Sequence, residues 1–146
     1  MLEKLIGIAY FTQNPPKSTG KEDFNLNWLL SQLQSLPREI EDADVQATLL
    51  ELTAVTIAQA CLSYSDIKTL YLCGGGALNH SLVTRLKGLM PELSVHTTKA
   101  LGIEPMWVEA AAFAWLAQQT IDSLPGSSAE VTGASRAAIL GGIYLP

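Results

Sequence analysis

The stretch from Ile67 to Arg85, IKTLYLCGGGALNHSLVTR, constrains the fold of this chain more than any other. An apolar run leads into three consecutive glycines, a polar corner at Asn79 follows, and a helical pattern then begins. This order lets a backbone come close to a nucleotide, because glycine has no Cβ and accepts positive φ, and the helix start presents free N–H groups. On pattern alone, a purely structural turn and a nucleotide contact stay equally open.

Length and composition limit the classes of protein that this sequence can encode. A chain of 146 residues is the size of one domain, and 48% hydrophobic residues can fill a core. The net charge of −5 argues against nucleic-acid binding, which needs clustered Lys and Arg. Cys61 and Cys73 make neither a disulfide framework nor a metal-ligand spacing, so we expect no metal site and an intracellular, cytoplasmic setting. No apolar run reaches the roughly 18 residues of a membrane span, and no signal-peptide cleavage site is recognisable.

The first part of the chain is expected to be helical. Helical spacing of apolar residues predicts helices over residues 1–12, 24–34 and 43–64, the last broad enough in its apolar face to be well buried. A polar loop over residues 15–24 separates the first two, and Thr19 with Glu22 suggests a capping box at the start of the second. The same loop fails as a Walker-type phosphate loop, because Pro16 stands before Lys17.

The second part combines strands with helices. Strands near residues 70–73 and 93–97 flank a helix over residues 78–90, which predicts a right-handed parallel βαβ unit. Pro105 is expected to begin a further helix with two apolar faces, and a short strand is possible near Ile143–Leu145. Few stretches have a strand pattern, so the sheet looks like part of a larger one whose other strands lie on another polypeptide segment.

Three single residues are candidates for chemistry. Glu109 falls in the first turn of the helix after Pro105, where the helix dipole stabilises a carboxylate, and its spacing points it partly inward. It is either a solvated or capping acid or an acceptor for a substrate hydroxyl. His80 is expected to cap or line the glycine turn, and His96 to be an ordinary strand residue. A dinucleotide site is disfavoured, since Asn79 stands where the fingerprint needs its third glycine.

Five blocks in order and spacing resemble the C-terminal half of the anhydro-N-acetylmuramic acid kinases. They are PPKSTGKEDFN, TLLELTAVTIA, YLCGGGALN, VEAAAFAWLA and VTGAS. The resemblance covers essentially the whole chain and implies an α/β fold: a partial actin-like ATPase (ribonuclease H-like) domain, helix-rich with a short, mostly parallel sheet, over residues 1–146. It implies ATP and Mg²⁺ as cofactors, with ATP in a cleft between two domains. It also implies that the anhydro ring of 1,6-anhydro-N-acetylmuramic acid is opened and phosphorylated at O6, in peptidoglycan recycling.

The resemblance also assigns roles to residues. Gly74, Gly75 and Gly76, with Asn79, match the adenosine motif of the family, and Glu109 matches the glutamate that positions the anhydro sugar. The run Lys17, Ser18, Thr19 and Gly20 matches a signature loop near the cleft that has no secure chemical role.

Family members are more than twice as long as this chain. The resemblance implies that the catalytic Asp, the first phosphate loop and most Mg²⁺ contacts belong to an N-terminal half outside it. We therefore expect this polypeptide alone to be inactive, and to pair with that half or to self-associate as a homo-oligomer. The alternative is a non-catalytic ligand-binding or self-associating fragment.

Overall fold

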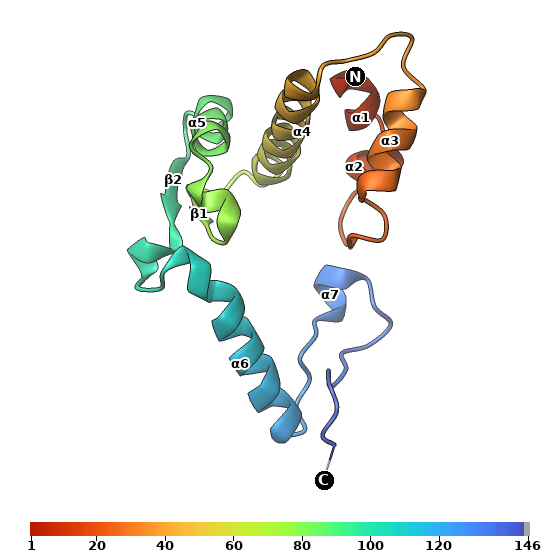
Figure 1. Cartoon of the computed structure of the whole chain (residues 1–146). Coiled ribbons are helices and arrows are strands. Elements are labelled where there is room, and N and C mark those ends of the chain that lie inside the picture. Colours follow the sequence, from red (N-terminus) through yellow and green to blue (C-terminus); the bar gives the residue numbers. More distant parts are fainter. Residues whose placement is uncertain (145–146) are drawn as a thin grey trace.

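The computed structural model describes residues 1–144 and shows mainly helices, which follow one another in an incomplete ring (Figure 1). The N-terminal helices are α1 (Leu2–Ile6), α2 (Ala9–Thr12), α3 (Leu26–Gln34) and α4 (Asp42–Leu62). The middle of the chain holds β1 (Thr69–Leu72), the 3-10 turn η1 (Gly75–Leu78), α5 (His80–Leu89) and β2 (Ser94–Thr97). The last elements are η2 (Thr98–Leu101), η3 (Pro105–Trp107), α6 (Val108–Ile121) and α7 (Ala129–Thr132).

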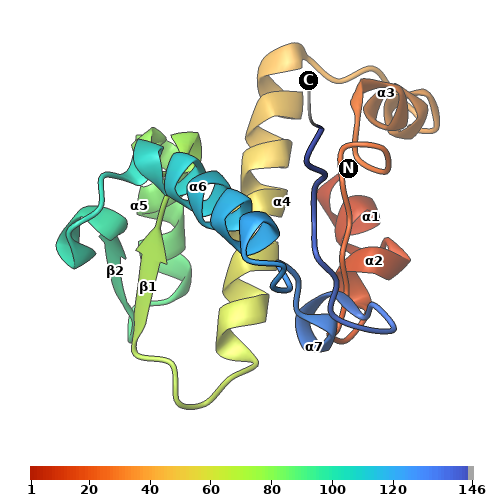
Figure 2. The same cartoon turned by 90° about the horizontal axis from the view of Figure 1, so that it is seen from below.

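Strands β1 and β2 confirm the predicted parallel βαβ unit. They pair in parallel with Thr69 opposite Ser94 and Leu72 opposite Thr97, and α5 makes the crossover between them. Helix α4 packs along α5 (Figure 2). Their contact is a core cluster of small and large apolar residues: Ala54 and Ala58 from α4 with Leu86 and Met90 from the α5 end. Side chains from both strands, Leu70, Leu72 and Leu93 among them, pack against this cluster. The α4–β1–α5–β2 unit is therefore the packed core of the chain.

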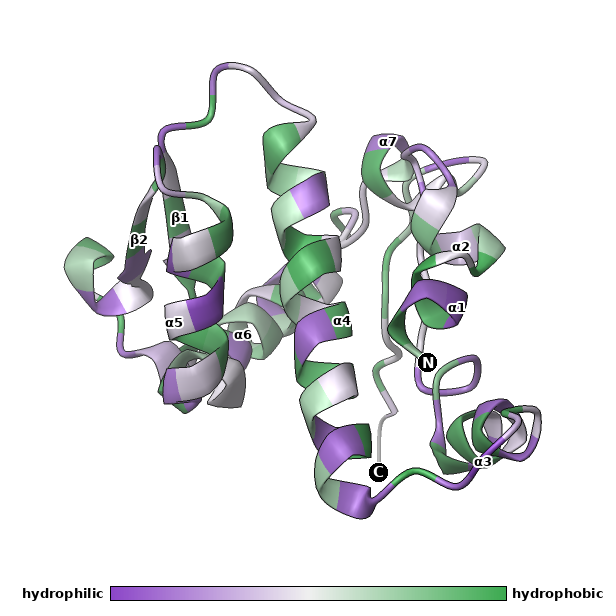
Figure 3. Cartoon of the chain, turned by 90° about the horizontal axis from the view of Figure 1, so that it is seen from above, coloured by the Kyte–Doolittle hydropathy of each residue, from purple (hydrophilic) through white to green (hydrophobic). Residues whose placement is uncertain are grey.

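Helix α4 is less buried than its broad apolar face predicts. Of its 21 residues, the buried ones are Val45, Leu52, Ala54 and Ala58. Hydrophobic and hydrophilic residues alternate along it (Figure 3). By length and composition alone it could cross a membrane, contrary to the sequence-based expectation. In the structure it packs against both α1 and α5, and 22% of its most apolar 18-residue stretch is buried.

The expected single helix over residues 1–12 is instead two short helices. Gly7 ends α1, with its N–H bonded to the carbonyl of Glu3, and Ile8 is extended (φ −65°, ψ 133°) before α2 begins. Glycine inside a short helical pattern favours such a break, because it loses the most conformational freedom in a helix. Leu5 of α1 is fully buried, so the first of the two helices is anchored to the core.

The predicted capping box at Thr19 is also wrong. Helix α3 begins at Leu26, and its N-cap is Asn25, whose Oδ1 accepts a hydrogen bond from the backbone N–H of Trp28 at 3.0 Å. The Thr19 hydroxyl donates instead to the Asp23 carboxylate at 2.9 Å. Both residue types cap helices well, and the choice falls on Asn25 because it adjoins the first apolar turn of α3.

Helix α6 contradicts the expectation that it packs on two faces. None of its residues is buried, and Phe113 and Trp115 are 71% and 53% exposed. The C-terminal segment returns from the end of α6, where the Gly126 N–H donates to the carbonyl of Ala138. Residues 143–144 form no strand; Leu145, in the predicted terminal strand, lies outside the described residues. The apolar faces of α6 are thus available to something other than residues 1–144.

Candidate functional site

The three glycines form a sharp turn between β1 and α5. Gly74 has φ 69° and ψ −171°, a conformation that a residue with a Cβ rarely adopts, and its N–H donates to the carbonyl of Pro105 at 2.9 Å. The chain then makes a 3-10 turn, closed by the Asn79 N–H on the carbonyl of Gly76 at 3.1 Å. One hydrogen bond thereby ties the glycine turn to η3, the segment that leads into α6.

Open space surrounds the outer side of this turn. A Cβ placed on Gly74 or Gly75 meets no atom within 4 Å, and on Gly76 it approaches Leu82 Cδ2 at 3.8 Å. The positive φ of Gly74 explains why a glycine occupies that position, whereas the φ of Gly75 lies outside the left-handed region. Neither conformation nor packing among residues 1–144 therefore requires a glycine at position 75. The backbone at Gly75 is therefore open to approach from outside the chain.

Asn79 stands where the turn becomes a helix, as predicted. Its Oδ1 accepts a hydrogen bond from the backbone N–H of Leu82 at 3.1 Å and caps α5. Beside it lies a groove of about 540 Å³ between α4 and the start of α5. The groove is lined by Gln46, Ala47, Leu49, Leu50, Thr53, Asn79, Ser81 and Leu82. A planar group of moderate size could lie against this wall with polar side chains at its edges.

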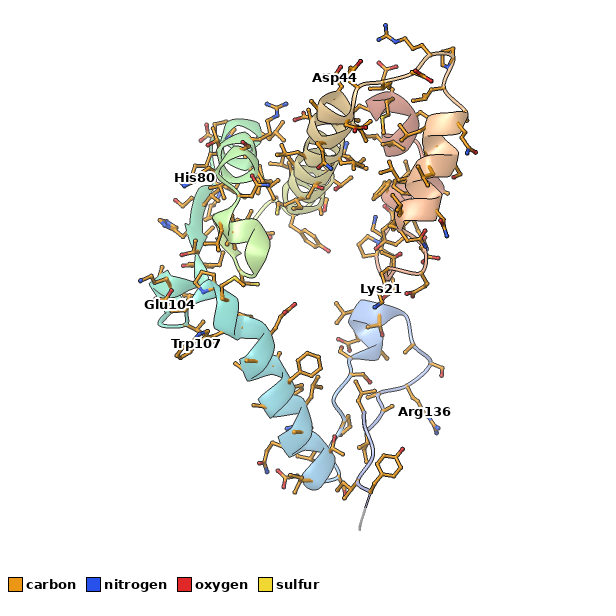
Figure 4. The ribbon with its side chains drawn as sticks, in the orientation of Figure 1. Lys21, Asp44, His80, Glu104, Trp107 and Arg136 are labelled. Atoms are coloured by element: carbon orange, nitrogen blue, oxygen red, sulfur yellow. The ribbon has the colours of Figure 1, made fainter. Side chains whose placement is uncertain are left out.

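The two histidines take different positions. His80 is the first residue of α5 and lines a second groove of about 530 Å³ with Leu50 and Arg85, while Asn79 provides the cap. Its side chain points away from α4 at the outer edge of the molecule (Figure 4). His96 lies in β2 with its ring 6.2 Å from that of Tyr71. His80 is thus near the glycine turn without capping its helix, and His96 is a strand residue as expected.

Glu109 lies in the first turn of α6, as the sequence predicts, but it does not point inward. The residue is exposed, as are its neighbours Ala112 and Phe113. The expected burial assumed a covered apolar face, and residues 1–144 leave that face open. The carboxylate follows Pro105 by four residues, and the Pro105 carbonyl holds Gly74, so Glu109 and the glycine turn are connected through one short segment.

Lys17 has a structural explanation within the loop over residues 15–24. Its Nζ donates to the carbonyls of Tyr10 and Phe11 at 3.0 and 3.3 Å and lies 5.0 Å from the centre of the Tyr10 ring. These contacts satisfy carbonyls at the end of α2 and hold the loop against it. Ser18 is exposed, and Gly20 has the Glu22 carboxylate where a Cβ would stand.

The structure brings that loop together with the VTGAS segment. A Cβ on Gly133 (φ 76°) would lie 3.8 Å from the Pro16 ring. The loop tip at Lys21 faces α7 in Figure 4. No hydrogen bond joins the loop to the glycine turn within residues 1–144, so the candidate residues fall into two separate groups.

An ion pair between α4 and α5 escaped the sequence analysis. Arg85 Nε and Nη2 donate to Glu51 Oε2 and Oε1, both at 2.7 Å, which is a bidentate arrangement. The hydrogen bond from Arg85 holds the pKa of the Glu51 carboxyl below its usual range. The two residues are 34 positions apart, so no local pattern reveals them. Their opposite charges are visible in the sequence, but the contact between their two helices is not.

The described residues offer little to a metal ion or to thiol chemistry. No group of three or more His, Cys, Asp or Glu side chains within residues 1–144 could hold a metal. Cys61 and Cys73 are both free, and burial raises the pKa of the Cys61 thiol.

A parallel strand pair, a glycine turn and a capped helix beside a groove define an α/β protein. The sequence profile of the anhydro-N-acetylmuramic acid kinase family matches residues 1–146, and the chain belongs to that family. It is 51% identical over 145 residues to the anhydro-N-acetylmuramic acid kinase of Coxiella burnetii (strain Dugway 5J108-111), covering 99% of this chain and 38% of that protein. It is 46% identical over 144 residues to the kinase of the same name from Shewanella loihica, 39% of which it covers.

Proposed function

We propose that this chain is the C-terminal half of an ATP-dependent kinase for 1,6-anhydro-N-acetylmuramic acid. The enzyme would open the anhydro ring and phosphorylate O6 to give N-acetylmuramate 6-phosphate, in cytoplasmic recycling of peptidoglycan. Membership of the family and 46–51% identity to its named members support the activity. The chain spans less than two fifths of those relatives, so the activity belongs to the longer protein.

The proposed fold of the complete enzyme is actin-like, with residues 1–146 in its C-terminal domain. The two-stranded parallel sheet is consistent with this, since such a small parallel sheet is rarely stable without further strands. The exposed faces of α6 agree, because Phe113 and Trp115 would be covered by other parts of the protein.

Gly75 carries the proposal for a nucleotide. Neither its backbone conformation nor its packing requires a glycine at this position. It lies in a turn that opens to solvent, next to the groove at Asn79. We assign the nucleoside of ATP to this wall, with the backbone at Gly74, Gly75 and Gly76 against it and Asn79 holding α5 in place. ATP supplies the transferred phosphoryl group when bound.

Glu109 is proposed to position the sugar. Its exposed carboxylate lies in the first turn of α6 and can accept a hydrogen bond from a sugar hydroxyl. The residue orients the acceptor and takes no proton in this proposal. The loop residues Lys17, Ser18, Thr19 and Gly20 are proposed to have a structural role, because Lys17 already donates hydrogen bonds to α2.

The base that activates the attacking water, and the Mg²⁺ ligands, are proposed to lie in the N-terminal half. Phosphoryl transfer depends on positioning and on charge neutralisation by metal ions, and residues 1–144 hold no group of three or more His, Cys, Asp or Glu side chains that could bind a metal. We therefore expect no turnover when the chain alone is mixed with ATP, Mg²⁺ and the anhydro sugar. Turnover under those conditions would contradict this division of the enzyme.

Titration calorimetry of this chain with ATP tests the nucleotide assignment. Gly75→Ala should weaken ATP binding at least tenfold without changing the free energy of unfolding, since the new methyl group touches nothing in the chain. The matched control is Gly88→Ala, which also adds a methyl group in open space but lies near the end of α5. Equal ATP affinity of the Gly75→Ala variant and the parent chain would remove the glycine turn from the site.

A second candidate, a self-associating fragment, is favoured by the exposed apolar residues of α6. If the chain occurs without the rest of the enzyme, we propose that two copies cover these faces for each other. Light scattering measures this directly, and a monodisperse monomer would contradict it.

A further inference from the structure

We propose that the Glu51–Arg85 ion pair is a positioning device that sets the width of the groove between α4 and α5, and through it the affinity for the nucleotide. The inference rests on the proposed function, because it assigns the nucleoside to the groove at Asn79. Neither residue is placed in contact with the ligand. Both residues act indirectly, through the helices that they join.

The location of the pair supports this role. Glu51 is flanked by Leu50 and Thr53, which line the groove on the α4 side. Arg85 lies one turn after Ser81 and Leu82, which line it on the α5 side. The ion pair thus crosses from one helix to the other at the level of the groove, and Arg85 itself lines the neighbouring hollow at His80.

The other contacts between these helices lie mainly beyond the groove. The buried members of the cluster, Ala54, Ala58, Leu86 and Met90, follow Glu51 and Arg85 in their segments. Leu82 reaches the cluster from the first turn of α5. Among residues 1–144, the two Glu51–Arg85 hydrogen bonds are the polar side-chain connection between α4 and α5. Leu82 holds the first turn of α5 against the cluster, and the two hydrogen bonds add a polar restraint one turn further along the helix.

The geometry suits a restraint on distance and angle. Two parallel hydrogen bonds of 2.7 Å fix the guanidinium plane relative to the carboxylate, which a single contact does not. The side chains are 26% and 44% exposed for Glu51 and Arg85, so the pair contributes little to overall stability and much to local geometry. Loss of either partner should let the start of α5 move relative to α4.

The test compares Glu51→Gln, Arg85→Gln, the double variant and the reversed pair Glu51→Arg with Arg85→Glu. Titration calorimetry of the whole chain with ATP should show binding three- to tenfold weaker in each single variant. The double variant should be no weaker than the singles, and the reversed pair should recover most of the affinity. Lys99→Gln is the matched control: it breaks the exposed Lys99–Glu104 pair elsewhere and should leave ATP binding unchanged.

A second measurement separates this inference from the proposed function. Amide hydrogen exchange in the ligand-free chain should rise over residues 80–84 in the single variants and stay the same over residues 86–90. If the parent chain does not bind ATP, the nucleotide assignment fails while the exchange result still decides whether the pair positions α5. Unchanged exchange over residues 80–84, or single variants with parental ATP affinity, would overturn the inference. A fall in unfolding free energy without either effect would show a purely structural pair.

Discussion

The α4–β1–α5–β2 unit and helix α6 carry similar apolar patterns but differ in what surrounds them. In the first, Ala54, Ala58 and Leu86 are at most 4% exposed and pack on one another. In the second, Phe113 is 71% exposed and no residue is buried. A periodic apolar pattern predicts that a helix will form, but it does not predict that its partner lies in the same chain.

The comparison also separates two kinds of candidate residue. The glycine turn and Asn79 sit on the packed unit, where hydrogen bonds and the core fix their positions. Glu109 lies on the exposed helix α6, which η3 joins to the packed unit. We expect the first group to keep its geometry in isolation and the second to need the remaining part of the enzyme.

Truncating one apolar side chain in each region should give very different losses of stability. Leu86→Ala removes a fully buried side chain from the core and should lower the free energy of unfolding by about 2–5 kcal/mol. Phe113→Ala removes a larger but exposed side chain and should change it by less than about 0.5 kcal/mol. Chemical denaturation of both variants measures this. A similar loss in the two would show that α6 is already packed in solution.

Substitution of the first glycine should strain the packed unit. Gly74→Ala places a Cβ at φ 69° and ψ −171°, which should cost about 1–3 kcal/mol of unfolding free energy. Gly75→Ala at the next position is the control, with no expected loss, because its φ is ordinary and its surroundings are open. Thermal unfolding compares the pair. Equal melting temperatures would mean that the turn relaxes to an unstrained conformation.

The two asparagine caps offer a finer version of the comparison. Asn79→Ala removes the cap of α5 inside the packed unit and should lower the free energy of unfolding by about 1 kcal/mol. Asn25→Ala removes the equivalent hydrogen bond from α3, a helix without buried residues. Its effect should appear as local fraying, detected by hydrogen exchange over residues 26–30, with a smaller change in global stability. The reverse order would indicate that α3 is part of the cooperative core.

The smallest expected effect is the pH dependence of the ion pair. The pKa of Glu51 is lowered in the folded chain, so its stabilising contribution is complete above the usual pKa of a glutamate. It is lost as the pH falls through the lowered value. The stability difference between the parent chain and Glu51→Gln should therefore shrink as the pH is taken from neutral into the acid range. Denaturation midpoints at several pH values measure it, and a constant difference would contradict an ionic interaction.

Local chemistry made the packed unit predictable from sequence. The apolar run, the glycines and Asn79 specify strand, turn and capped helix within a short stretch, and the parallel pairing of β1 and β2 followed from it. The limits of α4 were close to those expected. In each case neighbouring residues determine the conformation of the backbone.

Features that depend on distant atoms were not predictable. The inward direction expected for Glu109 presumed a cover that residues 1–144 do not provide. The Glu51–Arg85 pair needs the relative placement of two helices, which sequence periodicity does not contain. The role of Lys17 likewise became visible only when α2 and the loop were placed together.

The hydrogen bond from Gly74 to the Pro105 carbonyl has a mechanical consequence. The bond lies at the base of α6, whose 14 residues extend about 21 Å. It therefore fixes the point about which α6 can rotate. A rotation of a few degrees at this point moves the far end of α6 much further than the base. A partner that binds the outer end of α6 would therefore turn the helix about the backbone at Gly74. Conversely, a small movement of the turn on ligand binding would give a larger displacement at the outer end of α6.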